Sequence, residues 1–296
     1  MHALALVLLV LLAACPAPRP PARPGQPPNQ PGQTAPTPGK PTIAWKRIQT
    51  VADLPPAPAP GTYQVHMIDV GTGLAILVRG ADFAMLYDAG TNDRGEKPIR
   101  VVSYLAATLG PSGDDLCVET GATAPVTRVP LQHVVLSHPH LDHASALDLV
   151  VHCYDIGTFW DSGAVNDTVF YRELLGAIGR APKIAYRTAA TPAQDRAIAV
   201  KGTTVTMPRW DRFSEGDTVQ LGEGAKFTIL HAEGKKLGDF NENSIVLAVN
   251  LGGVKVLLVG DAESGQRKDP SYPVGDIEEH LIASFPEAIR SDILQV

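Results

Sequence analysis

The sequence predicts an α/β fold in which two β-sheets pack face to face and helices cover their outer faces, an αββα sandwich. Strand-like and helix-like segments follow one another in two similar blocks after residue 60, whereas a doubly wound sheet needs βα alternation throughout. The prolines mark the boundary of the domain, because 15 of the 26 lie in residues 16–60. A segment this rich in proline has few N–H donors and few apolar side chains to bury. We therefore expect a disordered tether at 15–60 and one globular domain at 61–296.

The first block of the domain combines short apolar strands with helices whose apolar residues recur every three or four positions. Val101, Val102, Leu105 and Leu109 carry the helical spacing in 99–109, and Gly179 can end a helix at 168–178. The expected strands are 63–69, 74–79, 83–88, 131–137 and 156–160, and the expected helices are 99–109, 142–151 and 168–178.

The second block repeats this pattern. The pair Gly252-Gly253 between two apolar runs predicts a β-hairpin. The expected strands are 203–207, 218–221, 226–231, 244–250, 254–259 and 292–296, with one helix at 276–283.

A dense group of histidines follows the strand 131–137 directly. His138 and His140 are two positions apart, so in an extended segment their rings point the same way. Asp142 and His143 then open a helix, whose N-terminus favours a carboxylate. Three imidazoles and one carboxylate suit zinc, or iron or manganese. The sequence therefore predicts a metal site here, the alternative being a solvated His-rich loop.

These four residues match the HxHxDH motif, and through it the chain resembles the metallo-β-lactamase-fold hydrolases. Ile68-Asp69-Val70-Gly71 and Tyr87-Asp88-Ala89-Gly90 resemble the family's early strand-end motifs, and Gly260-Asp261 closes a late strand. Within the family the chain looks most like the hydrolase domain of ComEC-type competence proteins. That closer resemblance rests on the turn from Asp69 to Gly73 and on the Asn-x-x-Ser segment from Asn241 to Ser244.

The resemblance implies two divalent metal ions, in the first place zinc, with manganese and iron as alternatives. His138 and His140 would bind one ion, Asp142 and His143 the second, and Asp261 would lie between them. A hydroxide shared by the ions would be the nucleophile, since bound metal lowers the pKa of water towards about 7. Asp142 and Asp261 would thus be the catalytic carboxylates of a metal-dependent hydrolase acting on a phosphodiester or related ester.

The family also supplies a final ligand from a His-His-Gly segment after a late strand. Here 292–296 resembles that strand and ends the sequence, so we expect either a truncated form of a longer chain or loss of the last histidine. The turn at 71–74 and the pair Ala144-Ser145 also depart from the family pattern. Two alternatives follow: a catalytically impaired, tethered binding domain that retains the fold, and an exported lactonase or β-lactamase-type hydrolase.

The N-terminus has the features of a targeting signal. Leu4 to Leu12 is almost unbroken Leu, Val and Ala, which has the length of a signal-peptide core and is short for a membrane span. Leu12-Ala13-Ala14-Cys15 resembles the lipobox of bacterial lipoproteins, which implies a signal peptide at 1–14 and acylation of Cys15. We expect an exported protein, lipid-anchored to a bacterial membrane, periplasmic or at the cell surface. The alternative is a soluble protein with an apolar N-terminus.

The charge of the chain is divided unevenly. Residues before Gly61 hold five basic and one acidic side chain, a net charge of +4, and the remaining 20 basic and 30 acidic side chains give −10. An acidic domain does not favour tight nucleic-acid binding, so the expected partner is a small-molecule or phosphodiester substrate. Apart from Cys15 only Cys117 and Cys153 are present, and a disulfide and two separate buried thiols both remain open.

Overall fold

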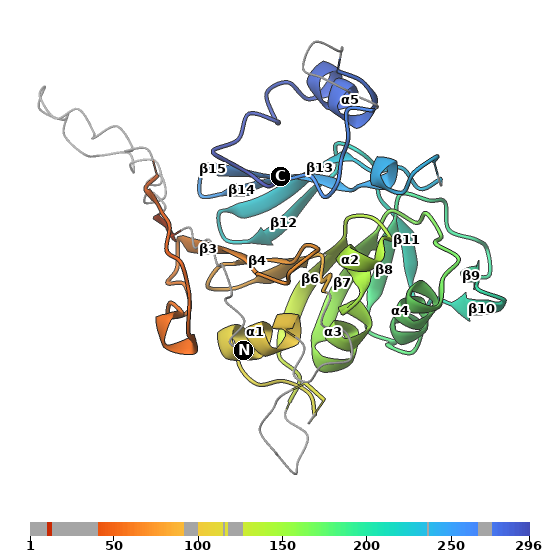
Figure 1. Ribbon diagram of the computed structural model, residues 1–296, viewed down its shortest axis with the longest axis horizontal. Helices are drawn as coiled ribbons and strands as arrows, with labels where there is room; N and C mark the ends of the chain where they lie inside the picture. The colour runs from red at the N-terminus through yellow and green to blue at the C-terminus, as the bar shows by residue number, and fades with distance from the viewer. Residues whose placement is uncertain are drawn as a thin grey trace, which may run out of the picture.

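The structure is a computed structural model, which describes residues 11–13, 41–91, 100–114, 116–117, 127–235, 237–265 and 274–296 (Figure 1). Its helices are α1 (Arg100–Leu109), α2 (Leu141–Ala144), α3 (Leu147–Cys153), α4 (Val169–Gly179) and α5 (Asp276–Ser284), with 3-10 turns η1 (Val51–Asp53) and η2 (Asn241–Asn243). Its strands are β1 (Leu11–Ala13), β2 (Ile43–Ala44), β3 (Thr62–Met67), β4 (Ile76–Arg79), β5 (Ala84–Tyr87), β6 (Pro130–Leu136), β7 (Asp155–Asp161), β8 (Ala185–Thr188), β9 (Ala197–Val200), β10 (Thr203–Thr206), β11 (Trp210–Arg212), β12 (Thr218–Gly222), β13 (Ala225–His231), β14 (Val246–Leu251), β15 (Val254–Leu258) and β16 (Ile293–Leu294).

Two sheets make up the centre of the molecule. The larger has the order β11-β8-β7-β6-β5-β4-β3-β1-β2 and the smaller the order β12-β13-β14-β15-β16, while β9 and β10 form a separate hairpin. In the larger sheet β5, β6, β7, β8 and β11 run parallel, so their carboxyl ends meet at one edge. Helices α1, α3 and α4 lie on one side of this pair of sheets and α5 on the other (Figure 1). The predicted αββα sandwich is therefore confirmed.

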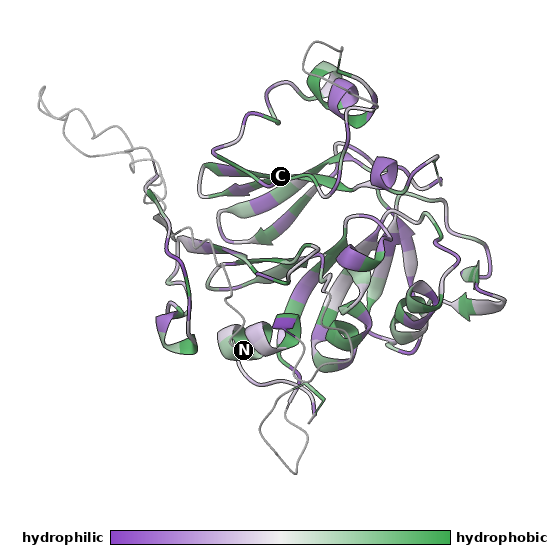
Figure 2. Ribbon diagram, viewed as in Figure 1, coloured by the Kyte–Doolittle hydropathy of each residue, from purple (hydrophilic) through white to green (hydrophobic). Residues whose placement is uncertain are grey.

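Three apolar layers hold the sandwich together. Leu105 and Leu174 belong to the layer between the larger sheet and its helices. Phe227 and Val249 belong to the layer between the two sheets, and the strands of the smaller sheet accordingly alternate hydrophobic and hydrophilic residues (Figure 2). Leu281 packs α5 against the smaller sheet. Among the described residues, none of the helices combines the length and the apolarity that a membrane crossing requires.

The folded part begins by residue 41, earlier than the expected boundary at residue 61. Ile48 is only 3% exposed, and η1 follows it. The carbonyl of Pro56 accepts a hydrogen bond of 2.9 Å from the Gln64 side chain, whose oxygen is in turn held by Arg79 at 2.7 Å. Partners on the domain thus satisfy a carbonyl that a Pro-rich segment cannot pair within itself. Residues 1–10 and 14–40, including Cys15, lie outside the described residues.

The expected helix at 142–151 is divided into α2 and α3. In a continuous helix the carbonyl of Asp142 would accept from the N–H of Ala146. Instead it accepts from Leu74 at 3.1 Å, and Ala146 donates to Ala89 at 2.9 Å. The hydroxyl of Ser145 also bonds to the backbone of the loop after β5. Tertiary hydrogen bonds therefore replace the helical ones at this point.

The sequence pattern does not predict β8, β9 or β11. Each has only three or four residues, too few to establish a period. The strands and helices that the sequence does predict are present with shifted ends. They include the short β16, which pairs in parallel with β15. Of the two alternatives for the cysteines, the disulfide between Cys117 and Cys153 is the one that forms.

The buried His133 should lower the free energy of unfolding in mild acid. It lies on β6 between the sheets, packed against Phe227, and accepts a hydrogen bond from the indole N–H of Trp160 at 3.2 Å. Burial, assisted by the charge of Arg187, lowers the pKa of His133 from 6.5 to about 4. A histidine with a lowered folded-state pKa stabilises the fold above its unfolded pKa, and that contribution is lost as the pH falls towards the folded value.

We therefore expect His133 to make the free energy of unfolding about 2 kcal/mol smaller at pH 5 than at pH 7. Urea unfolding at both pH values measures the effect. His133→Phe should lose that part of the pH dependence, while replacement of the half-exposed His280 by Ala should keep it. Equal pH dependence in wild type and His133→Phe would contradict the assignment.

Candidate metal centre

The candidate site lies where ends of strands from both sheets meet. Ser137 and His138 directly follow β6, at the edge where the parallel strands end. His143 lies on α2, which begins three residues later, and Asp261 follows β15 of the smaller sheet. The site therefore belongs to the interface between the sheets and forms only when both are packed together.

Three of the predicted ligands come together at this point. The ligand atoms of His138, His143 and Asp261 all lie within 4.8 Å of one another. Nε2 of His143 is 3.2 Å from Oδ1 of Asp261, and Nε2 of His138 is 2.9 Å from Nδ1 of His140. Two nitrogens bound to one tetrahedral zinc lie about 3.3 Å apart, so the pair of histidines is close to that spacing.

Asp88 holds this centre from the buried side. Its carboxylate is fully buried and accepts three hydrogen bonds: from the Ser137 N–H at 2.7 Å, the Ser137 hydroxyl at 2.7 Å, and Nδ1 of His143 at 2.8 Å. Its φ of 58° turns it out of β5, a conformation that Asp tolerates better than most residues. A carboxylate on the far nitrogen of a ligating histidine orients the ring and raises its basicity.

The surroundings give the two buried histidines opposite protonation preferences. Burial, with the nearby charges of His143 and His140, lowers the pKa of His138 to about 3, so this ring is neutral. Burial opposes charge on His143 as well, but the adjacent Asp88 and Asp261 raise its pKa to about 10. The hydrogen bond from His143 also lowers the pKa of Asp261. The two carboxylates, Asp88 and Asp261, therefore outnumber the one protonated histidine, His143. A bound cation would neutralise the remaining negative charge.

Two glycines position α2 against the early strands. The carbonyl of Asp142 lies against both Gly73 and Gly90, where an added Cβ would be 2.3 Å and 1.2 Å from its oxygen. Gly73 also has a φ of +127°. The two early motifs of the sequence therefore contribute backbone surface that admits α2, with His143, to the centre.

The expected division of ligands into His138 with His140 and Asp142 with His143 stays a prediction. The cluster takes one member from each pair and adds Asp261, while Asp142 lies outside it. Asp142 instead uses its backbone carbonyl to fix α2. Sequence periodicity predicts which face of a strand or helix a side chain occupies. It does not predict which ligand atoms from separate segments come together.

His140 occupies the rim of the centre. Its side chain is 35% exposed, its Nε2 lies 3.7 Å from Asp239, and its ring stands edge-on to Phe240. Sequence reasoning missed Asp239 as well as Ser137. The signal for Ser137 was its place between a strand and the motif, whereas Asp239 comes from a polar loop with no pattern.

Ser244 joins the two sheets at the site. Its hydroxyl accepts from the N–H of Asp261 at 3.3 Å and lies 3.5 Å from Nδ1 of His138. His231 donates to the carbonyl of Ser244 at 2.8 Å and is buried beside it. Ser244 ends the Asn-x-x-Ser segment of the sequence, and the structure assigns it a positioning contact.

These residues fit a divalent metal ion. A neutral imidazole, a second imidazole backed by a buried carboxylate, and a half-exposed carboxylate are the donor set that zinc takes. Without a positive charge at this position, Asp88 and Asp261 depend on a single histidine cation for neutralisation. His138, His143 and Asp261 would hold the ion, with His140 at the open side.

The fold and the site together define the class. Residues 68–289 match the model of the metallo-beta-lactamase superfamily, and the chain belongs to that superfamily. Its members are typically metal-dependent hydrolases that bind metal ions, often zinc.

One curated relative and several solved structures are similar to this chain. The uncharacterized protein YcaI of Escherichia coli (strain K12) is 33% identical over 109 residues, which are 37% of this chain and only 12% of the relative. The metallo-beta-lactamase SMB-1, solved with mercaptoacetic acid, is 16% identical with a TM-score of 0.36, covering 77% of this chain and 73% of that one. Zn(2+)-bound PqqB from Methylobacterium extorquens is 12% identical with a TM-score of 0.33, covering 63% and 52%. At such scores these likenesses add no argument to the family assignment.

Proposed function

We propose that this protein is a metal-dependent hydrolase whose centre is built on His138, His143 and Asp261. The observation that carries the proposal is the approach of these three ligand atoms to within 4.8 Å, with Asp88 buried behind His143. A divalent ion held there, zinc in the first place, supplies Lewis-acid polarisation and lowers the pKa of a water. Family membership supports this class of reaction.

The residues of the chain have separate tasks in this proposal. Asp88 fixes the ring of His143 so that Nε2 faces the centre, and Ser137 joins the same hydrogen-bond group. Asp261 is 43% exposed, so it reaches both the buried histidines and the solvent side from which a substrate arrives. Half-exposed His140 is placed to contact a substrate or a second ion.

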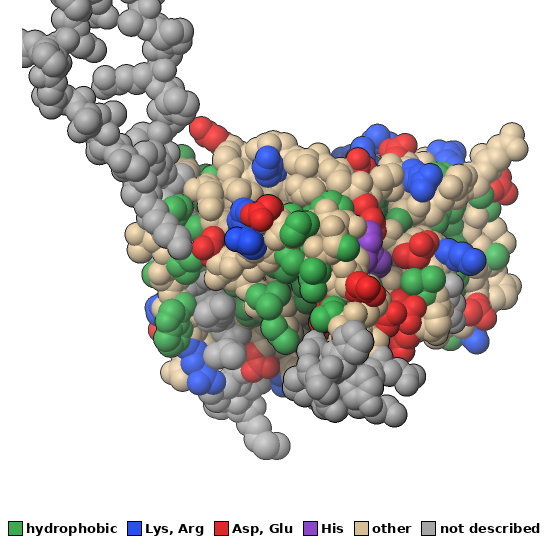
Figure 3. Space-filling model, turned by 90° about the horizontal axis from the view of Figure 1, so that it is seen from above, with side chains coloured by type: hydrophobic (Ala, Val, Ile, Leu, Met, Phe, Trp, Pro, Cys, Tyr) green, Lys and Arg blue, Asp and Glu red, His purple; other side chains and the backbone are tan. Residues whose placement is uncertain are grey.

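We propose a phosphodiester or a related ester as the substrate. The domain after residue 60 carries the net charge of −10 given above, and Asp239 lies 3.7 Å from His140 at the rim of the centre. On the face drawn in Figure 3, acidic side chains lie beside the exposed histidine surface. A substrate with a single negative charge suits such a surface better than a polyanion such as DNA. Resemblance to the ComEC-type hydrolase domain supports the phosphodiester, while the acidic surface favours a small one.

The test is metal content together with turnover. Dialysed wild-type protein should contain stoichiometric transition metal and hydrolyse the generic phosphodiester bis(p-nitrophenyl) phosphate. His138→Ala and Asp261→Ala should lose the metal, and turnover should fall at least about 100-fold, since the metal effect is worth several kcal/mol. His280→Ala is the matched control, because its ring pairs with Glu215 and is not among the side chains whose ligand atoms converge. Wild-type protein without stoichiometric metal would rule out the proposal.

A second candidate is a catalytically impaired binding domain. Asp142 lies outside the cluster, so the residues that converge suffice for one ion rather than two. One bound ion with no turnover on phosphodiester, lactone and β-lactam substrates would favour this candidate. Turnover of nitrocefin or a lactone alone would instead identify the exported lactonase or β-lactamase type.

We further propose that the domain is exported and anchored through a lipid on Cys15. The apolar run and lipobox-like residues support this, and Leu11–Ala13, which pair as β1 with β2 and β3, would be removed by cleavage before Cys15. Cell fractionation tests the proposal: wild-type protein should sediment with membranes and Cys15→Ser should not acquire lipid. Equal lipid labelling of both would contradict it.

A further inference from the structure

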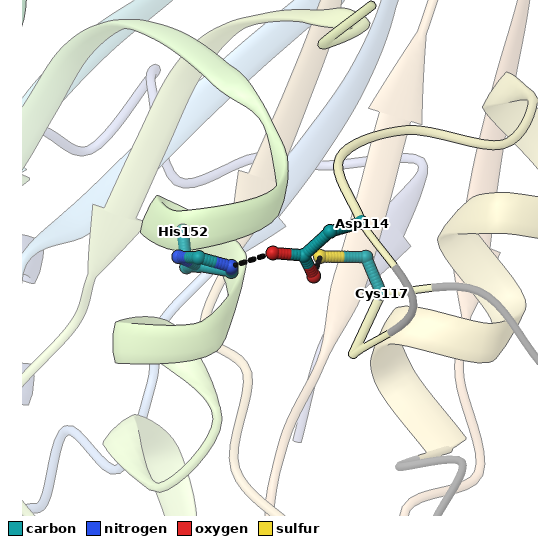
Figure 4. Close-up of side chains that lie close together, drawn as sticks. All are labelled: Asp114, Cys117 and His152. Carbon is teal, nitrogen blue, oxygen red and sulfur yellow. Dashed lines mark hydrogen bonds and ion pairs between the residues drawn. The ribbon is translucent and has the colours of Figure 1, made fainter. Parts of the chain in front are cut away.

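A second group of metal-ligand side chains lies far from the candidate centre in the fold, at the carboxyl end of α3. Asp114 and Cys117 come from the loop after α1, and His152 comes from α3 (Figure 4). Their side chains point toward one another, and their ligand atoms lie within 4.8 Å of each other. Cys153, next to His152, is bonded to Cys117 but lies outside this group, so it becomes available as a fourth ligand only when the disulfide opens.

From this geometry we infer a redox-dependent zinc site formed by Asp114, Cys117, His152 and Cys153. In the disulfide form the sulfurs are not thiolates and cannot bind zinc strongly. In the reduced form two thiolates, one imidazole and one carboxylate make a four-coordinate set of ligands that zinc binds. The same loop and helix are therefore joined by a disulfide under oxidising conditions and by zinc under reducing conditions.

The turn that carries two of the ligands is already ordered. The carboxylate of Asp114 accepts the N–H of Leu116 at 3.0 Å, and the Cys117 N–H donates to the Asp114 carbonyl at 2.9 Å. Oδ2 of Asp114 is 2.8 Å from Nε2 of His152, and its Oδ1 is 3.5 Å from the sulfur of Cys117. The turn therefore holds the carboxylate beside both the imidazole and the sulfur, as binding of one shared ion requires.

The loop does not depend on the disulfide alone. The hydroxyl of Ser112, itself buried, donates to the carbonyl of Cys153 and accepts the N–H of Val129 at 2.8 Å. The loop therefore stays beside α3 when the sulfur–sulfur bond opens. The cysteine backbones start from suitable positions, with a Cα–Cα distance of 5.6 Å.

The site also has an entry path. His152 and Leu116 line a surface hollow of about 870 Å³, and the side chains of Asp114 and His152 are each 41% exposed. The sulfurs lie behind them, since Cys117 and Cys153 are only 3% and 0% exposed. Zinc can thus arrive through the two exposed ligands and be completed by the buried thiolates.

An external dithiol is the reductant that opens the disulfide. It gives two electrons and two protons to the Cys117–Cys153 bond and becomes a disulfide, while the two cysteines become thiols. Zinc then binds and the two thiol protons pass to solvent. An external disulfide reverses the reaction: it takes two electrons from the two thiolates and two protons from solvent and becomes a dithiol, while the Cys117–Cys153 bond re-forms and the metal is released.

Cobalt(II) titration of the full chain tests this inference, in a Cys15→Ser background that leaves only these two cysteines. After reduction with dithiothreitol and its anaerobic removal, a thiol reagent should count two free thiols. Cobalt should then produce a thiolate-to-metal charge-transfer band, which added zinc abolishes. The candidate catalytic centre contains no cysteine, so the band reports only this second site. Oxidised protein should show no band.

A ligand variant and a matched control complete the test. His152→Ala should weaken cobalt binding by more than the 10–100-fold that loss of a second-shell partner costs. His280→Ala, which also removes a half-exposed histidine paired with a carboxylate, should leave it unchanged. Far-UV circular dichroism follows the fold of each sample. Reduced protein with two thiols and no band, folded or unfolded, overturns the inference, as does a band that His152→Ala leaves unaltered.

Discussion

Gly90→Ala is expected to unfold the protein or to destabilise it by more than about 4 kcal/mol, and to lower its metal affinity with it. The new Cβ would lie 1.2 Å from the carbonyl oxygen and 1.9 Å from the carbonyl carbon of Asp142. These are backbone atoms of α2, and the Gly90 N–H is itself bonded to Leu74. Relief of the clash therefore requires α2 to move, and His143 moves with it.

Urea unfolding and metal titration measure these two effects. Gly176→Ala is the matched control, because Gly176 lies inside α4 and its added Cβ would meet only the flexible end of Arg180, at 3.2 Å. In that helix interior the same substitution should stabilise by up to about 1 kcal/mol. A Gly90→Ala protein with normal stability and normal metal affinity would show that the early glycine motif does not position α2.

Asp88→Asn is expected to lower metal affinity about 10- to 100-fold and to reduce stability by on the order of 3 kcal/mol. Asparagine keeps the shape and tolerates the left-handed conformation. Its single carbonyl oxygen cannot accept all three donors that Asp88 now satisfies, and its NH2 group faces other donors. His143 loses its anionic partner, so the ring is both less basic and less firmly oriented.

Isothermal titration with zinc and urea unfolding separate the two parts of this prediction. Asp161→Asn provides the comparison, because Asp161 is equally buried but accepts from Tyr171 and Tyr186 instead of from the metal ligands. It should lose stability and keep metal affinity. If Asp88→Asn behaved like Asp161→Asn, Asp88 would be a structural residue without influence on the centre.

Much of the fold followed from local patterns. The period of 3.6 in α1 and the Gly252-Gly253 turn between β14 and β15 depend on neighbours in the chain, and both were predicted with nearly correct ends. The break between α2 and α3 was not predictable, because its cause is a hydrogen bond to Leu74, far away in the sequence. The ordered stretch from residue 41 was missed for the same kind of reason: the carbonyl of Pro56 finds its partner on β3.

The sequence by itself determined the chemistry of this protein: which side chains can bind a metal, that they follow a buried strand, and that the domain around them is acidic. Only the tertiary structure decided which of them converge. It joined Asp261 to His138 and His143, placed Asp88 behind them, and left Asp142 to fix a helix. It also brought Cys117 and Cys153 together as a disulfide, where the sequence left two separate thiols open. The physical reason is that composition and spacing determine local structure along the chain. A site of this kind is formed by strand ends whose relative positions depend on how the two sheets pack.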